Sequence, residues 1–291
     1  MFNSPQSISE RRRGIALTAA GALGFSTIII FTRLIQGIPA PSIAFFRALS
    51  SFLFFSILRF RSSKNPQIRH DRCAIPRLIG LGTAVGATGM FYVYAVQHTT
   101  AANAVLLNNT AVIYVSLLAP YLLKEAHSRY TWISLSLAMI GIVCIANPAE
   151  LELHSRAFWG VAAAALSGIT YTMVMLLSRL LRDQVSGIVQ IWWSTGIAAL
   201  LALPWAFLVS WEVLVQNLPL LVALGVLAQG IPYLLYFLGL QRVDAQIVSI
   251  VALLEPVGGI LIGIVLYHEI PGAVGLAGIV MIFASIALVS Q

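Results

Sequence analysis

Apolar segments follow one another along almost the whole chain, and only short polar connections separate them. A helix needs roughly 20 apolar residues to cross the hydrocarbon layer of a bilayer. Because the segments reach about that length, the pattern predicts an all-α integral membrane protein with no soluble domain. Ten transmembrane helices are expected, at about 14–36, 41–59, 75–97, 101–123, 130–147, 156–178, 187–210, 218–240, 245–267 and 271–290.

Composition and the placement of charge support this prediction. The 291 residues are 59% hydrophobic and only 9% charged, which excludes a soluble protein of this size. With a cytoplasmic N-terminus, fourteen of the seventeen Lys and Arg residues fall on the cytoplasmic side. This bias predicts a multi-pass protein of the cell inner membrane with both termini in the cytoplasm. Membrane topology and contact with anionic lipid then account for the net charge of +7, so no nucleic-acid partner is expected.

The second half of the sequence repeats landmarks of the first half at a constant offset of 144 positions. Each half contains five predicted spans, an odd number, so the second half must be inverted relative to the first. Inverted repeats are typical of alternating-access transporters, whose substrate site lies in a central cavity between the halves. The matched landmarks are Gln97 and Gln241, Ala101 and Ala245, Glu125 and Glu269, Gly24 and Gly168, Gly86 and Gly230, and Tyr92 and Tyr236.

The repeat divides the chain into four parts. Residues 1–13 form a cytoplasmic tail, 14–147 a first five-helix repeat, 148–155 a polar linker, and 156–291 a second five-helix repeat.

Glu255 is the most unusual residue of the sequence, because it lies near the middle of an apolar span. A carboxylate at membrane depth is costly and indicates a functional site, where it would meet a substrate amino group or carry a proton. The alternative is a structural acid, kept neutral or satisfied by a neighbouring helix. Pro256 follows directly and is expected to break the helix, leaving the carbonyl of Ala252 without a partner. The first-half equivalents of these two residues are Ala111 and Val112.

Polar and aromatic side chains on other spans are candidates for the walls of the cavity. A tyrosine ring offers apolar area and its hydroxyl a directional contact, which suits an amphipathic substrate. Packing and interhelical hydrogen bonding are the alternative roles for each of them. The candidates are Tyr92, Asn108, Tyr114, Ser167, Tyr171, Gln229, Tyr233 and Tyr236.

Two groupings support this choice. Gln229, Tyr233 and Tyr236 recur at helical spacing on the eighth span, and Pro232 within this stripe is expected to open the helix. Asn108 and Tyr114 lie three residues either side of Ala111 and are expected to share its inward face.

Three further charged residues are expected to have structural roles. Arg47 lies about six residues into the second span and could reach the interface, pair with an acid such as Glu269, or bind a substrate carboxylate. Structural pairing is the preferred interpretation. Glu125 and Glu269 close the fourth span of each half and are interpreted as architectural.

These features together resemble a known family. Two five-span halves, each with a fourth span that ends in Glu (LLKE and LYHE), are similar to the drug/metabolite transporter superfamily, and most of all to its EamA-type exporters. Phe45-Phe46-Arg47 and Leu254-Glu255-Pro256-Val257 match as well, whereas Val112 stands where the family often has Pro. Length and aromatic content most resemble the YddG-type amino-acid exporters. The resemblance implies a carrier that exports amino acids or related metabolites without a nucleotide.

Other function classes fit less well. Neither a paired catalytic constellation nor a filter loop is present, which argues against an intramembrane enzyme and a channel. Cys73 and Cys144 have no metal spacing, and neither a metal nor a cofactor is expected. The remaining hypothesis is secondary-active export of aromatic and other apolar amino acids by alternating access. Efflux of drugs or organic cations is the alternative, since Glu255 and aromatic rings suit both. A small-molecule substrate and the lipid bilayer are the expected partners, and a monomer is compatible with the sequence.

Overall fold

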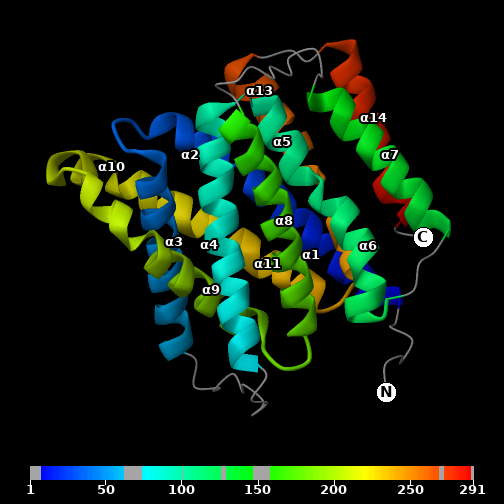
Figure 1. Cartoon of the computed structure of the whole chain (residues 1–291), viewed down its shortest axis with the longest axis horizontal. Helices are drawn as coiled ribbons and strands as arrows, with labels where there is room; N and C mark the ends of the chain where they lie inside the picture. The colour runs from blue at the N-terminus through cyan, green and yellow to red at the C-terminus, as the bar shows by residue number, and fades with distance from the viewer. Residues whose placement is uncertain are drawn as a thin grey trace.

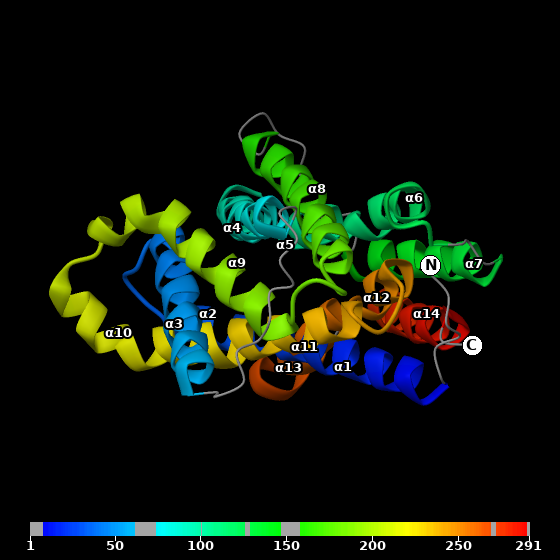
Figure 2. The same ribbon diagram turned by 90° about the horizontal axis from the view of Figure 1, so that it is seen from below.

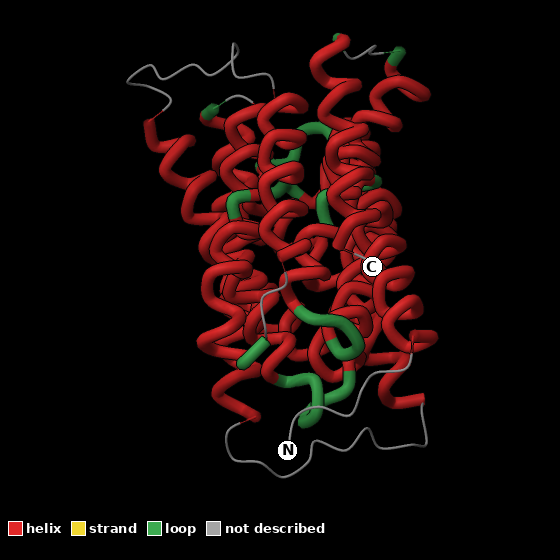
Figure 3. The backbone as a smooth tube through the Cα atoms, turned by 90° about the vertical axis from the view of Figure 1, so that its right-hand side faces the viewer, coloured by secondary structure: helices red, strands yellow, loops and turns green. Residues whose placement is uncertain are grey.

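The computed structural model describes residues 8–61, 74–99, 101–125, 129–146, 158–268 and 272–289. Within these ranges every regular element is a helix, and the helices run side by side as one bundle (Figures 1 and 3). Eight helical segments are long and apolar enough to cross a membrane, and two shorter apolar helices at Tyr130–Ile145 and Ala273–Val289 complete a set of ten. The predicted all-α membrane fold is therefore confirmed.

Several predicted spans consist of more than one helix. The first half contains α1 (Ile8–Ser26), α2 (Ile28–Leu34), α3 (Ala40–Arg61), α4 (Ala74–His98), α5 (Ala101–Asn109), α6 (Ala111–Leu123) and α7 (Arg129–Ala146). The second half contains α8 (Phe158–Leu180), α9 (Gly187–Ala202), the 3₁₀ helix η2 (Leu203–Leu208), α10 (Trp211–Ala223), the π-helix η3 (Leu224–Gly230), α11 (Ile231–Leu240), α12 (Ala245–Val251), α13 (Leu254–Tyr267) and α14 (Ala273–Val289).

The fourth span of the second half breaks between α12 and α13. Pro256 lies in the first turn of α13, where its missing N–H would have no intrahelical partner. The carbonyl of Ala252 is not left unpaired, however, because it accepts a hydrogen bond from the N–H of Glu255 at 2.9 Å. The expectation of an unpaired acceptor beside the acid was wrong, since a tight turn at the break supplies another donor.

The fourth span of the first half is also broken, between α5 and α6, although no proline lies at the break. Thr110 stands at this break, and its hydroxyl donates to the carbonyl of Leu107 at 2.6 Å. Such a local side-chain bond competes with the helical ladder and can interrupt it. Gly168 on α8 allows the close approach, because a Cβ there would lie 2.8 Å from the Thr110 hydroxyl. The two fourth spans thus share a break but differ in its cause.

The eighth span is distorted rather than broken. The π-helix η3 ends at Gly230, directly before α11. Pro232 is the second residue of α11. Because proline cannot donate to the carbonyl of Ala228, the ladder must change there. Single π-turns inside α-helices are frequent at functional sites.

Helices of the two halves pack against each other throughout the bundle. Helix α4 lies along α8, α1 along α11, and α7 along α14 (Figures 1 and 2). Where α7 and α14 cross, a Cβ on Gly141 would lie 2.9 Å from the carbonyl oxygen of Gly278. The hydroxyl of Ser285 donates to the carbonyl of Ser134 at 2.7 Å. These two contacts fit only antiparallel helices, so the fifth spans of the two halves run in opposite directions.

Candidate substrate site

Glu255 lies at the break of the fourth span in the second half, at the start of α13. Its backbone carbonyl accepts a hydrogen bond from the hydroxyl of Ser26 at 3.0 Å, which ties α1 to the break. Helix α1 can come this close because Gly258 has no side chain; a Cβ there would meet Ser26. The break is therefore held through the backbone carbonyl of Glu255. The carboxylate of Glu255 takes no part in this contact and is available to other groups.

A polar cluster surrounds this carboxylate inside the bundle. Its members come from helices of both halves, α3, α4, α8 and α11. Tyr236 is 0% exposed and Tyr171 6% exposed, and their rings stack with centroids 6.3 Å apart. The ring of Phe25 packs edge-on against Tyr233 at 4.7 Å. The groups close enough to interact electrostatically with Glu255 are Arg47, Tyr92, Tyr171, Tyr233 and Tyr236.

A small cavity lies beside this cluster. It holds about 20 Å³, enough for a water molecule but not for an amino acid. Two of its lining groups have unused hydrogen-bonding capacity, since Arg47 Nε and Gln229 Oε1 are buried without a partner. Most of the other walls are small side chains or glycines. The lining residues are Ala44, Arg47, Ala48, Val85, Gly86, Gly89, Met90, Ala198, Ala202, Gln229 and Tyr233.

Arg47 was expected to pair with an acid, and Glu269 was the suggested partner. Glu269 lies outside the described residues. None of the ion pairs between described residues involves Arg47. Its guanidinium instead lies against the backbone of α4, where a Cβ on Gly89 would come within 2.8 Å of Nη2.

Two other candidates meet away from this cavity. The hydroxyl of Ser167 donates to Asn108 Oδ1 at 3.0 Å and to the carbonyl of Ala164 at 2.7 Å, so α5 and α8 are joined there. Tyr114 is 36% exposed and is not brought into the polar cluster. Its expected alignment with Asn108 required a continuous helix, and the break at Thr110 interrupts that register.

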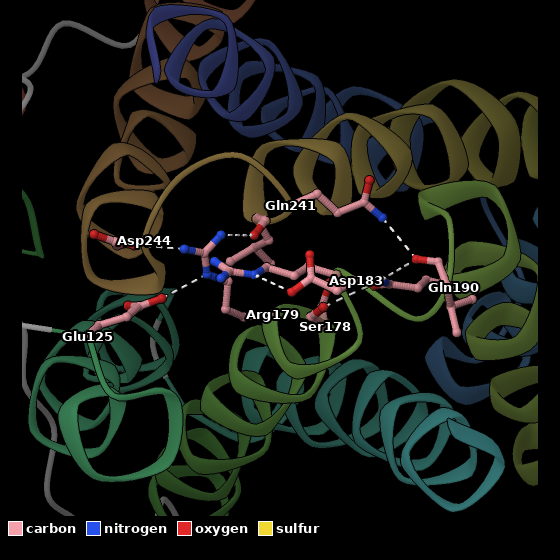
Figure 4. Close-up of polar contacts among 10 residues, drawn as sticks. Glu125, Ser178, Arg179, Asp183, Gln190, Gln241 and Asp244 are labelled. Carbon is pink, nitrogen blue, oxygen red and sulfur yellow. Dashed lines mark hydrogen bonds and ion pairs between the residues drawn. The ribbon is translucent and has the colours of Figure 1, made fainter. Parts of the chain in front are cut away.

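Arg179 is a buried, ion-paired residue that the sequence analysis did not single out, because it counted only as one of the basic residues of the cytoplasmic side. It is 3% exposed, at the end of α8, and its guanidinium makes three hydrogen bonds of 2.7 Å (Figure 4). The acceptors are the carboxylates of Glu125 and Asp244 and the carbonyl of Leu240. These groups, together with Arg179, are called the Arg179 network below.

The Arg179 network joins the two halves at one end of the bundle. Glu125 follows α6 in the first half, and its second carboxylate oxygen accepts the N–H of Ala245, the first residue of α12, at 2.9 Å. A carboxylate at a helix N-terminus satisfies a free donor and faces the positive end of the helix dipole. Glu125 thus holds α8 and α12 of the second half together.

The fold and this site define a multi-pass membrane protein with a buried polar centre, and comparison with known proteins identifies its class. The chain belongs to the EamA-like transporter family, whose model matches residues 12–147 and 158–291. It is therefore a transporter with a small-molecule substrate and not an enzyme.

Individual relatives of this chain are named as transporters as well. An uncharacterized transporter of Archaeoglobus fulgidus is 28% identical over 277 residues, which cover 95% of this chain and 96% of the relative. The uncharacterized transporter YxxF of Bacillus subtilis is 23% identical, over 94% of this chain and 86% of its own length. A solved crystal structure at 17% identity covers 96% of this chain and 98% of its own with a TM-score of 0.81, which shows a shared fold.

Proposed function

We propose that this transporter is a secondary-active exporter of amino acids that works by alternating access. The observation that carries the proposal is the polar cluster around Glu255. A carboxylate inside the bundle offers a binding partner for an ammonium group, and the tyrosine rings near it offer an apolar surface for a side chain. Aromatic and other apolar amino acids combine both features.

The two inverted halves supply the mechanism. In the described conformation the Arg179 network joins the halves at one end, which the distribution of basic residues assigns to the cytoplasmic side. The cavity of about 20 Å³ is too small for an amino acid. Loading and release therefore require the halves to move apart, at the two ends in turn.

Transport by purified protein in proteoliposomes tests the proposal. Labelled phenylalanine, tryptophan and leucine are compared with organic cations such as tetraphenylphosphonium, with and without a pH gradient. We expect saturable flux of the amino acids that empty liposomes lack. Flux of the cations alone would support the alternative of organic-cation efflux and overturn the proposal.

Replacing Glu255 tests the acid itself. We expect Glu255→Gln to reduce amino-acid flux roughly tenfold to hundredfold, the effect of losing a hydrogen bond to a charged group. Glu212→Gln removes the same charge from an exposed position in the first turn of α10 and is the matched control. Unchanged flux in Glu255→Gln would assign the acid a structural role. Flux that persists but no longer responds to pH would favour a proton relay over substrate binding.

A further inference from the structure

Arg47 is a partly buried cation that forms no ion pair with any other described residue. Its Nε is buried and has no hydrogen-bond partner, and no ion pair between described residues includes it. Glu255 interacts with it electrostatically, but the two residues do not form an ion pair. A guanidinium in such surroundings is costly unless an anion completes it.

The space beside Arg47 is small and is lined mostly by residues with short side chains. Gly86 and Gly89 of α4 and Ala198 and Ala202 of α9 form walls without bulk, so the guanidinium opens onto free volume. A guanidinium presents its donors as a planar fork, which matches the two oxygens of a carboxylate. Among the described residues, no glutamate or aspartate side chain lines this cavity. A carboxylate supplied by a ligand would complete Arg47 there.

Gln229 places an acceptor in the same cavity. Its Oε1 is buried without a partner, and the residue is 3% exposed. An α-amino acid carries its ammonium and carboxylate on one carbon, so both groups would reach Gln229 and Arg47 together once the halves move apart and enlarge this cavity. Gln229 Oε1 and the nearby Glu255 then accept from the ammonium while Arg47 donates to the carboxylate.

We infer that Arg47 binds the carboxylate of the substrate, that Gly89 leaves the room its guanidinium needs, and that transport requires a free carboxylate. This inference rests on the proposed function and goes further, because it excludes plain organic cations and amines as substrates. Gly89 is a positioning residue: a Cβ there would lie 2.8 Å from Arg47 Nη2 and displace the guanidinium, the movable end of a flexible side chain.

Three related compounds test the requirement for a carboxylate in proteoliposomes. Phenylalanine, phenylalanine amide and phenethylamine share the ring and the amine, but only the first has a carboxylate. We expect saturable flux of phenylalanine, and neither of the other two should be transported or compete. Equal transport of phenylalanine amide would overturn the inference while leaving an amine exporter in place. No flux of any amino acid would overturn the proposed function together with this inference.

Variants of Arg47 and Gly89 test the residues. We expect Arg47→Gln to raise the KM for phenylalanine about tenfold to hundredfold, the loss expected for a hydrogen-bonded charge, with a smaller change in the maximal rate. Arg47→Lys should recover part of the affinity, because the charge returns without the fork. Gly89→Ala should raise KM severalfold, and its matched control is Gly272→Ala, where a Cβ would meet no atom within 4 Å.

A structural role for Arg47 would give a different pattern. It would lower protein yield or thermal stability in detergent without changing the preference for phenylalanine over its amide. If Arg47→Gln folds and keeps the wild-type KM and preference, the inference is wrong although amino-acid export stands. If Arg47→Gln fails to fold, the KM values of Arg47→Lys and Gly89→Ala decide, and wild-type values in both would overturn the inference.

Discussion

The two ends of the bundle are built from equivalent positions of the repeat but are held together by different chemistry. At one end, Arg179 makes buried hydrogen bonds to Glu125 and Asp244. At the other end, Ile35 occupies the position equivalent to Arg179 at the offset of 144. Ile35 is 7% exposed and packs in an apolar cluster with Leu221. The backbone repeat is twofold, whereas the charged network belongs to one end.

The end that contains Ile35 has a polar contact of its own. The backbone N–H of Gln36 donates a hydrogen bond to Asn217 Oδ1 on α10 at 3.4 Å. Asn217 Nδ2 donates to the carbonyl of Gln36 at 3.2 Å. These are neutral hydrogen bonds, each worth about 1 kcal/mol, and they satisfy the chain after α2. A carrier that opens its ends in turn would separate the charges of the Arg179 network at one end and, among the described residues, the apolar cluster of Ile35 and the Asn217–Gln36 contact at the other.

Of the variants that test this difference between the ends, a replacement of Arg179 should lower the stability of the protein most. Arg179→Gln leaves Glu125 buried without its cation, and breaking a buried ion pair in this way costs about 3–5 kcal/mol. Unfolding of the purified protein in detergent, titrated with a denaturing detergent, measures the loss. Arg182→Gln is the control, because Arg182 is partly exposed and pairs with the neighbouring Asp183. Equal stability of Arg179→Gln and Arg182→Gln would show that the network does not hold its end together.

The opposite end should respond less strongly. Asn217→Ala removes both hydrogen bonds to Gln36 and leaves two backbone groups without a partner, so a loss of about 1–2 kcal/mol is expected in the same assay. Gln216→Ala is the neighbouring exposed control on the same helix. A loss as large as that of Arg179→Gln would mean that the amide contact, and not charge, sets the stability of a bundle end.

Much of the fold could be predicted from the sequence, because hydropathy reports membrane spans directly. The break at Pro256 could also be predicted from the sequence, because proline changes the backbone at its own position. The break at Thr110 was not visible, because many threonines lie in unbroken helices and only the approach of Gly168 distinguishes this one. The sequence shows local causes well and contacts between helices poorly.

The site shows the same limit. Glu255 was identified because an acid in the middle of an apolar run is anomalous by itself. Arg179 lies near the end of a span, where a basic residue is already explained by topology. Its partners Glu125 and Asp244 are 54 and 65 residues away in the sequence, and no periodicity links them. A sequence signal did exist, since an arginine within the apolar run Leu176-Leu177-Ser178-Arg179-Leu180 needs a partner if that turn is buried.

Replacing Asp244 should have the smallest effect and shows which carboxylate matters within the Arg179 network. The side chain of Asp244 is 50% exposed, whereas that of Glu125 is 6% exposed. Solvent screens the Arg179–Asp244 pair, so Asp244→Asn should cost at most about 1 kcal/mol. Asp183→Asn, at a more exposed side chain, is the control and should change stability less. A loss of several kcal/mol in Asp244→Asn would mean that Asp244, at the start of α12, and not Glu125 provides the main counter-charge for Arg179. The link between the halves through Glu125 would then be secondary to the pairing of α8 with α12 within the second half.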